Sequence, residues 1–152
     1  MNDITASDIM TSAVATVRED SSVQDLAKLL TRKKISGAPV IDDENRVVGI
    51  VSEGDLVSQD ADIHFPHYIE LLGNIIYLES VKKYEERLEK AAASLVGEIM
   101  TTDVVTVQKD APLHEIATVM TEKKVNRLPV VDGDILVGII TRGDVVRAMA
   151  KG

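Results

Sequence analysis

The sequence predicts an α/β fold in which two β-α-β-β-α repeats pack with pseudo-two-fold symmetry, with a helical insert between them. Two observations carry this prediction. Runs rich in Val and Ile alternate along the chain with segments whose apolar residues follow the period of a helix. The order of these segments near the start of the 152 residues then returns near the end.

Short motifs mark the repeat and divide the chain into a first repeat at 1–58, an insert at 59–96 and a second repeat at 97–152. A unit of about 55 residues has too small a core to be stable alone, so we expect the two repeats to form one module. The recurring motifs, each followed by its second copy, are Ile9-Met10-Thr11 and Ile99-Met100-Thr101, Pro39-Val40 and Pro129-Val130, Val48-Gly49-Ile50 and Val137-Gly138-Ile139, and Gly54-Asp55 and Gly143-Asp144.

In the first repeat, Asp20-Ser21-Ser22 supplies an N-cap for an amphipathic helix that ends near Lys33-Lys34, where cations suit the helix dipole. The turn at 42–45 is flanked by two apolar runs, which indicates a hairpin. The expected elements are a strand at Val14–Val17, a helix from Val23, strands at Ala38–Ile41 and Arg46–Val51, and a helix opened by Ser52-Glu53-Gly54-Asp55.

The second repeat predicts the same order, and the insert predicts two helices. Tyr68–Leu78 carries apolar residues on more than one helical face, so we expect burial against its own module and against a second chain. Ser80–Leu95 is typical of a charged, solvated helix. The expected elements of the second repeat are a strand at Val104–Val107, a helix at Leu113–Lys123, strands at Leu128–Val131 and Ile135–Ile140, and a helix from Gly143.

Composition narrows the possible functions. Aromatic residues make up 3% of the chain and cysteine is absent, so aromatic stacking platforms, disulfides and thiolate metal sites are excluded. A net charge of −8 argues against nucleic-acid polymers and anionic membranes as partners. The N-terminus lacks a signal-peptide pattern, and the longest apolar stretch is about half as long as a bilayer-spanning helix. We therefore expect a cytoplasmic protein.

Two copies of a hydroxyl-x-x-Asp motif, Ser52 with Asp55 and Thr141 with Asp144, lie where a strand is expected to pass into a helix. At such a junction a hydroxyl can donate to a phosphate oxygen, and a carboxylate can accept both hydroxyls of a ribose. The same spacing is also that of a capping box, so either motif by itself could simply cap its helix.

The repeated pattern resembles the CBS domain, and the pair resembles a Bateman module. The resemblance implies a regulatory sensor without catalytic activity that binds adenine nucleotides (AMP, ADP or ATP, with or without Mg) between the repeats. It also implies a homodimer that acts on an effector protein. The residues that carry it are Asp8 to Thr11, Ile35 to Val40, Val48 to Asp55, and the second-copy segments around Met100, Asn126 to Val130 and Gly138 to Asp144.

In this family the motif of one repeat works with strands of the other, which implies two clefts with aliphatic walls around the adenine. The first cleft would be formed by Ile50, Ser52, Asp55, Val104, Val105, Val125, Arg127 and Pro129. The second would be formed by Val14, Ala15, Ile35, Gly37, Ala38, Pro39, Ile139, Thr141 and Asp144.

Arg127 stands where the first repeat has Gly37, so the two clefts are not equivalent. A guanidinium can bind a phosphate through two hydrogen bonds, and we therefore expect the cleft of Asp55 and Arg127 to prefer a phosphorylated nucleotide. Arg127 could instead form a surface salt bridge.

Other functions remain as alternatives. The module could bind S-adenosylmethionine or a dinucleotide, or it could be an interaction subunit whose clefts stay empty. His64 and His67 could suggest a metal-dependent hydrolase, but Pro66 lies between them and no third ligand is evident, so no metal site is expected. His114 is expected to be exposed, and Met10, Met100 and Met120 to fill the core.

Overall fold

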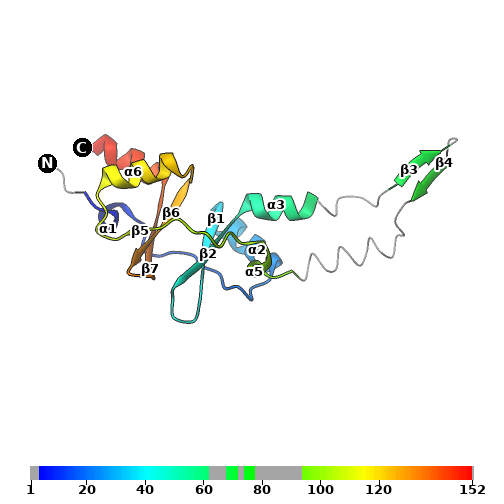
Figure 1. Cartoon of the computed structure of the whole chain (residues 1–152), viewed down its shortest axis with the longest axis horizontal. Coiled ribbons are helices and arrows are strands. Elements are labelled where there is room, and N and C mark those ends of the chain that lie inside the picture. Colours follow the sequence, from blue (N-terminus) through cyan, green and yellow to red (C-terminus); the bar gives the residue numbers. More distant parts are fainter. Residues whose placement is uncertain (1–3, 62–67, 72–73, 78–93, 152) are drawn as a thin grey trace.

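The computed structural model describes residues 4–61, 68–71, 74–77 and 94–151. It confirms the α/β class and the repeated order of elements (Figure 1). The first repeat contains α1 (Ala6–Ile9), α2 (Val23–Lys33), β1 (Gly37–Ile41), β2 (Val47–Ser52) and α3 (Glu53–Ala61). The second contains α5 (Val96–Ile99), β5 (Val107–Gln108), α6 (Leu113–Glu122), β6 (Arg127–Asp132), β7 (Ile135–Thr141) and α7 (Arg142–Lys151).

The ends of α2 lie where the sequence places them. The hydroxyl of Ser22 accepts a hydrogen bond from the backbone N–H of Asp25 at 3.0 Å, which satisfies one of the free donors of the first turn. At the other end, Lys34 has a left-handed backbone with φ 55° and stops the helix.

Each repeat holds an antiparallel hairpin, β1 with β2 and β6 with β7, in matching register. The strands expected at Val14–Val17 and Val104–Val107 are much shorter than expected. In the first, only Val17 joins the sheet, through a parallel bridge to Val40. In the second, pairing with β6 starts at Val107. Residues ahead of the first pairing point instead line a cavity, among them Val14 and Ala15.

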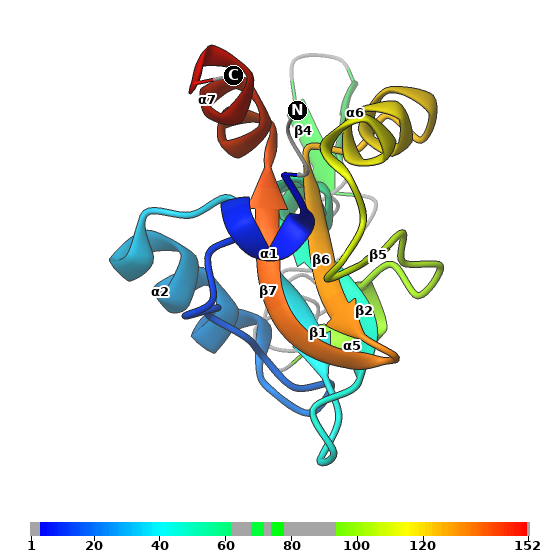
Figure 2. The same cartoon turned by 90° about the vertical axis from the view of Figure 1, so that its left-hand side faces the viewer.

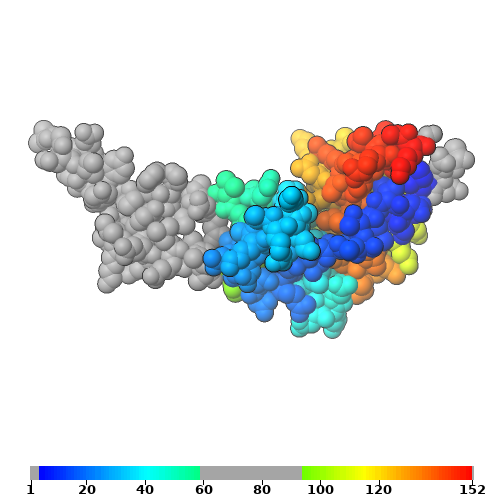
Figure 3. Space-filling view, turned by 180° about the vertical axis from the view of Figure 1, so that it is seen from behind, coloured from blue at the N-terminus to red at the C-terminus, as the bar shows by residue number. Residues whose placement is uncertain are grey.

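The start of each repeat packs on the other repeat. The backbone N–H of Ala6 in α1 donates to Ala111 at 2.9 Å, and α1 contacts β7 and α7 (Figure 2). Conversely, the N–H of Val96 in α5 donates to Ser21 at 2.8 Å, and α5 contacts β2 and α3. In the space-filling view the N-terminal segment lies against the C-terminal helix (Figure 3). The two repeats are therefore interlocked.

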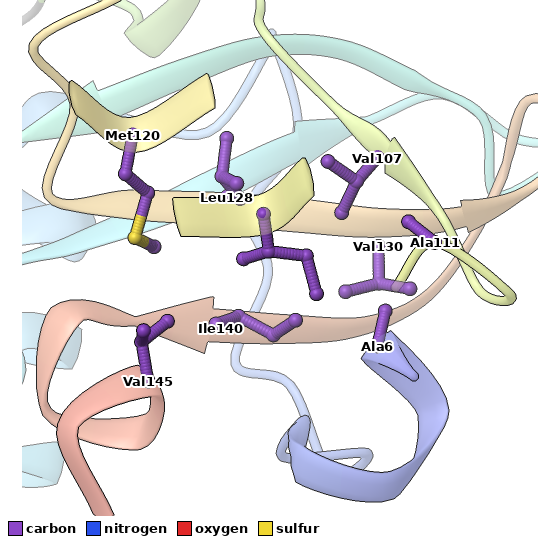
Figure 4. Close-up of a cluster of buried hydrophobic side chains, with 9 residues drawn as sticks. Ala6, Val107, Ala111, Met120, Leu128, Val130, Ile140 and Val145 are labelled. Carbon is purple, nitrogen blue, oxygen red and sulfur yellow. The ribbon is translucent and has the colours of Figure 1, made fainter. Parts of the chain in front are cut away.

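Two aliphatic clusters form the core, and each contains one residue from the opposite repeat. Ala6 joins the second-repeat cluster beside Val130 and Ile140 (Figure 4). Val96 joins the first-repeat cluster beside Leu26 and other buried aliphatic residues. Each fully buried Val, Leu or Ile contributes about 1.5–3 kcal/mol, so Val96 adds to the stability of a cluster whose other buried members belong to the first repeat.

Two methionines fill the space between the start of each repeat and a glycine in the sheet of the other repeat. Met10 lies against Gly138 and Met100 against Gly49, so closely that a Cβ on either glycine would lie within 2.5 Å of the sulfur. Met120 is buried and the other two are half-buried beside the cores, as expected from the sequence.

The expected helix at Tyr68–Leu78 is wrong, because the described part of this segment is a hairpin of β3 (Tyr68–Leu71) and β4 (Asn74–Tyr77). The β-branched Ile75 and Ile76 favour a strand and a glycine at position 73 disfavours a helix, and these local preferences outweigh the helical pattern. Of the expected charged helix, residues 80–93 lie outside the described residues. Across the described ranges, no helix is long and apolar enough to span a bilayer.

Candidate functional site

A cavity of about 1100 Å³ opens between the two repeats. We call it the Thr141 cleft. It is lined by the segment that precedes the first sheet, by α2 and the start of β1, and by the end of the β6–β7 hairpin. Of the residues assigned to this cleft from the sequence, the structure brings together Val14, Ala15, Ile35, Gly37, Ile139 and Thr141.

The other residues assigned to this cleft lie elsewhere. Ala38 and Pro39 are buried within β1. Asp144 lines a separate pocket of about 270 Å³ beside Asp8 and Lys151. Its Oδ2 accepts from the N–H of Thr141 at 2.8 Å and from its hydroxyl at 3.1 Å, and its Oδ1 pairs with Arg147. In this structure the Asp144 carboxylate therefore caps α7.

The carboxylate of the first motif accepts the same two hydrogen bonds. Oδ2 of Asp55 accepts from the N–H of Ser52 at 2.8 Å and from its hydroxyl at 3.2 Å. Thr141 and Asp144 form the full capping box, since the N–H of Asp144 also donates to the Thr141 hydroxyl at 3.3 Å, and Ser52 and Asp55 form the half in which the carboxylate accepts from the cap backbone. Because a hydroxyl carries a single proton, Ser52 and Thr141 would have to release their Asp partners before they could donate to a ligand.

We keep the name Asp55 cleft for the first cleft expected from the sequence, to which Ser52, Asp55 and the other residues named there were assigned. Its apolar members are half-buried, except for Pro129, which is fully buried in β6. Ile50 pairs with Thr101 through an antiparallel bridge, while Val105 and Val125 pack against the second-repeat core. The half-buried members are Ile50, Val104, Val105 and Val125.

The structure places Arg127 differently from the sequence prediction, which assigned it to the Asp55 cleft. Its side chain crosses to the first repeat, lies over Gly37 and lines the Thr141 cleft. A Cβ on Gly37 would lie 2.7 Å from Nη1 of Arg127, and Nη2 donates to the Ser36 hydroxyl. The glycine leaves the space that the guanidinium fills.

Burial lowers the pKa of Arg127, and the nearby carboxylates of Glu53 and Asp55 act in the opposite direction. The net shift is downward, yet an arginine stays charged at neutral pH. The guanidinium is therefore partly desolvated, and its hydrogen-bond partner on the first repeat is a neutral hydroxyl. An anion entering the cleft would restore the interactions that this cation has lost from water.

Further polar residues line the same cleft. Lys33 and Lys34 bring positive charge from the end of α2, and Glu53 is the carboxylate that lies with them. Hydroxyls come from Thr11, Thr31 and Ser36 in addition to Thr141. With its aliphatic residues, the cleft can hold a ligand that combines a flat apolar part with an anionic group.

The sequence prediction missed the contribution of α2 to this cleft. Ala27, Leu30 and Thr31 line it from the helix, as does Ser36 from the turn that follows. Their periodicity identifies a helix face, but only the packed structure shows that part of this face borders a cavity. For Ser36 a signal existed, because it directly precedes the glycine whose partner position is Arg127.

His64 and His67 lie outside the described residues. His114 is exposed on α6, as expected. Within the described ranges, no group of three or more His, Asp and Glu side chains is arranged to hold a metal ion.

Comparisons with known proteins bear on the family and the fold. A family model described as "CBS domain" matches residues 6–62 and 96–151. The protein MJ1426 of Methanocaldococcus jannaschii is 34% identical over 152 residues, which cover 93% of this chain and 89% of that protein. Chloroplastic CBSX2 of Arabidopsis thaliana is 36% identical over 135 residues, and the match spans 57% of its length.

Two solved structures are similar to the whole chain. The crystal structure of CBSX2 in complex with AMP has a TM-score of 0.74 and 34% identity, and the match covers 97% of this chain and 96% of that one. The CBS domain pair of MJ0100, solved with 5'-methylthioadenosine and S-adenosyl-L-methionine, has a TM-score of 0.70. It is 23% identical, with 99% of this chain and 98% of that one covered, so this likeness concerns the fold alone.

Proposed function

The chain belongs to the CBS domain family and carries two repeats, and on this premise we propose that it is a regulatory module that binds an adenine nucleotide in the Thr141 cleft. The observation that carries the proposal is the partly desolvated guanidinium of Arg127 on the wall of a cavity between the repeats. The AMP complex of CBSX2, at 34% identity, supports the same ligand class.

The cleft offers a place for each part of a nucleotide. Val14, Ile35 and Ile139 would enclose the purine, since apolar walls favour a flat heterocycle even without aromatic stacking. The phosphate would be bound by Arg127, and the Thr141 hydroxyl would become a further donor if its proton turned from Asp144 to the ligand. A phosphorylated nucleotide is therefore preferred in this cleft rather than in the Asp55 cleft.

Asp144 is proposed as the acceptor for the ribose hydroxyls. It lies one helical turn beyond Thr141, and its Oδ1 is engaged by Arg147 in this structure. Asp144 lines the neighbouring pocket in this structure and its side chain is only 13% exposed, so binding a ribose would require the carboxylate to leave Arg147 and turn toward the Thr141 cleft. Replacing Asp144 with Asn should weaken the binding of adenosine and of AMP by the same factor.

A nucleotide in this cleft would contact both repeats and could change their arrangement. The size of such a shift is limited by the difference in ligand affinity between the two arrangements. No catalytic step is needed for this role, and an effector protein would sense the change.

We propose that the module acts as a homodimer through equivalent helices of the two repeats. Val57 on α3 and Val146 and Met149 on α7 are 63–68% exposed. Pairing these faces with a second copy would bury them. Native mass spectrometry should show a dimer, and the Val57→Lys/Val146→Lys variant should be a monomer; a monomeric parent protein would contradict the proposal.

Isothermal titration calorimetry with AMP, ADP, ATP, S-adenosylmethionine and NAD tests the ligand class, with and without Mg²⁺. We expect the adenine nucleotides to bind and an Arg127→Gln variant to lose phosphate selectivity. If S-adenosylmethionine or NAD binds more tightly than AMP, ADP and ATP, that compound and not an adenine mononucleotide is the ligand. Failure of all five compounds to bind would contradict the proposal and favour an interaction subunit with empty clefts.

A further inference from the structure

The charge of the Thr141 cleft is opposite in sign to that of the whole chain. The sequence carries a net charge of −8. The charged residues among those that line the cleft are Lys33, Lys34 and Arg127, which are cationic, and Glu53. A local excess of positive charge on the wall of a cavity attracts anions even where the overall charge is negative.

The three cations come from one part of the cleft wall. The guanidinium of Arg127 lies over Gly37 and donates to the Ser36 hydroxyl. Ser36 follows Lys34 by two residues, so their Cα atoms lie within about 7 Å of each other. The side chains of Lys33 and Lys34 are long and flexible, and their ammonium groups can therefore reach an anion that extends beyond the guanidinium.

Both lysine side chains have hydrogen-bonding capacity for a ligand. They are exposed, and neither forms an ion pair with any residue that the structure describes. Other donors at this end of α2 are engaged within the helix. The Thr31 hydroxyl donates to the Ala27 carbonyl at 2.8 Å, and the backbone N–H of Lys34 donates to the carbonyls of Leu30 and Thr31.

The second repeat carries an equivalent pair, Lys123-Lys124, at the end of α6. Lys34 and Lys124 have the same left-handed backbone, with φ 55°. Cations at the C-terminal end of a helix interact favourably with its dipole, and this accounts for both pairs. Among the described residues, however, the first pair lines the Thr141 cleft and the second does not. The dipole therefore does not explain why one pair borders a cavity.

We propose that Lys33 and Lys34 make the Thr141 cleft selective for nucleotides with more than one phosphate, so that ATP and ADP bind more tightly than AMP. This inference rests on the proposed function, because it requires the purine and the first phosphate in that cleft. With the first phosphate bound by Arg127, the second and third extend along the wall toward the two ammonium groups. Glu53 repels these phosphates, but the two lysines outnumber it.

The exposure of the lysines sets the size and the salt dependence of the effect. Exposed ion pairs are weak, so we expect a preference on the order of threefold for each lysine and about tenfold for both. Charges in solvent are screened strongly at high salt, where the Debye length falls to about 3 Å at 1 M. The preference for ATP over AMP should therefore shrink as the salt concentration rises.

Isothermal titration calorimetry with AMP, ADP and ATP tests the inference. Mg²⁺ is left out because it would neutralise part of the phosphate charge, and the titrations are made at about 0.1 M and about 1 M NaCl. A titration of ATP into protein saturated with AMP shows whether the two compete for one cleft. We expect ATP to bind most tightly, AMP least tightly, and ATP to displace AMP.

Two double variants assign the preference to the cleft. Lys33→Gln/Lys34→Gln should lose most of the ratio between the ATP and AMP affinities. Lys123→Gln/Lys124→Gln removes the same two charges from the equivalent helix end, and it should retain that ratio. Thermal melts establish that both variants are folded.

The outcomes separate this inference from the proposed function. The inference is wrong, while nucleotide binding stands, if ATP binds no more tightly than AMP or does not displace it. It is equally wrong if Lys33→Gln/Lys34→Gln keeps the preference, or if both double variants lose it to the same extent. If none of the three nucleotides binds, the proposed function fails and the selectivity fails with it.

Discussion

The contact between Met10 and Gly138 offers the sharpest test of the interlocked fold. A Cβ on Gly138 would lie 2.2 Å from Sδ of Met10, 2.7 Å from its Cγ and 3.0 Å from its Cβ. The next residue, Thr11, pairs with Ile139, and both line the Thr141 cleft. A methyl group at position 138 therefore presses on the segment that builds the cleft wall.

Gly138→Ala should destabilise the protein by about 1–3 kcal/mol, the usual cost of overpacking a filled site. For a chain of this size, each kcal/mol lowers Tm by about 2–4 °C. The matched control is Gly54→Ala on α3, where the nearest atom to the added Cβ, Oγ of Ser52, lies at 3.5 Å. This control should be neutral or slightly stabilising, since alanine favours a helix.

A double-mutant cycle links the cost to Met10. In a Met10→Ala background the added methyl group no longer meets the sulfur, so the two substitutions together should cost about 1 kcal/mol less than their sum. Thermal denaturation followed by circular dichroism measures all four proteins. Strictly additive costs, or a Gly138→Ala variant as stable as the Gly54→Ala control, would refute the packing of one repeat on the other.

Three further predictions concern the site and the caps. Arg127→Gln should weaken AMP binding about tenfold to a hundredfold in calorimetry, the value of a hydrogen bond to a charged group, and leave adenosine unaffected; equal losses for both ligands would contradict the phosphate role. Hydrogen bonds from Arg46 lower the pKa of Asp42, so its stabilising contribution is complete above the ordinary Asp pKa of about 3.9 and is lost as the pH falls below it. The difference in Tm between the parent protein and Asp42→Asn should therefore shrink between pH 6 and pH 2.5, and a constant difference would argue against this. Ser22→Ala should cost about 1 kcal/mol in urea denaturation through the lost N-cap, whereas Ser58→Ala should cost much less; equal effects would contradict the capping role.

The order of elements follows from local patterns in the sequence. Periodicity and capping residues predict α2 and the two hairpins within a few residues, because these signals depend on neighbours along the chain. The insert shows where such reasoning fails. Two strands or one helix can bury the same apolar residues of Tyr68–Tyr77, and the pattern of a short apolar run does not by itself distinguish the two.

The membership of the Thr141 cleft is only partly predictable. Strand positions such as Ile139 follow from the repeat and the family resemblance, whereas the residues contributed by α2 depend on how the helix packs. The direction of the Arg127 side chain depends on the space left by a glycine in the other repeat. No pattern local to Arg127 contains that information.

A crystal structure of the protein with AMP tests the central claim most directly. The account predicts AMP between the two repeats, its purine against Val14 and Ile139, and its phosphate within hydrogen-bond distance of the Arg127 guanidinium. AMP bound outside the Thr141 cleft, or bound there with its phosphate away from Arg127, would contradict it.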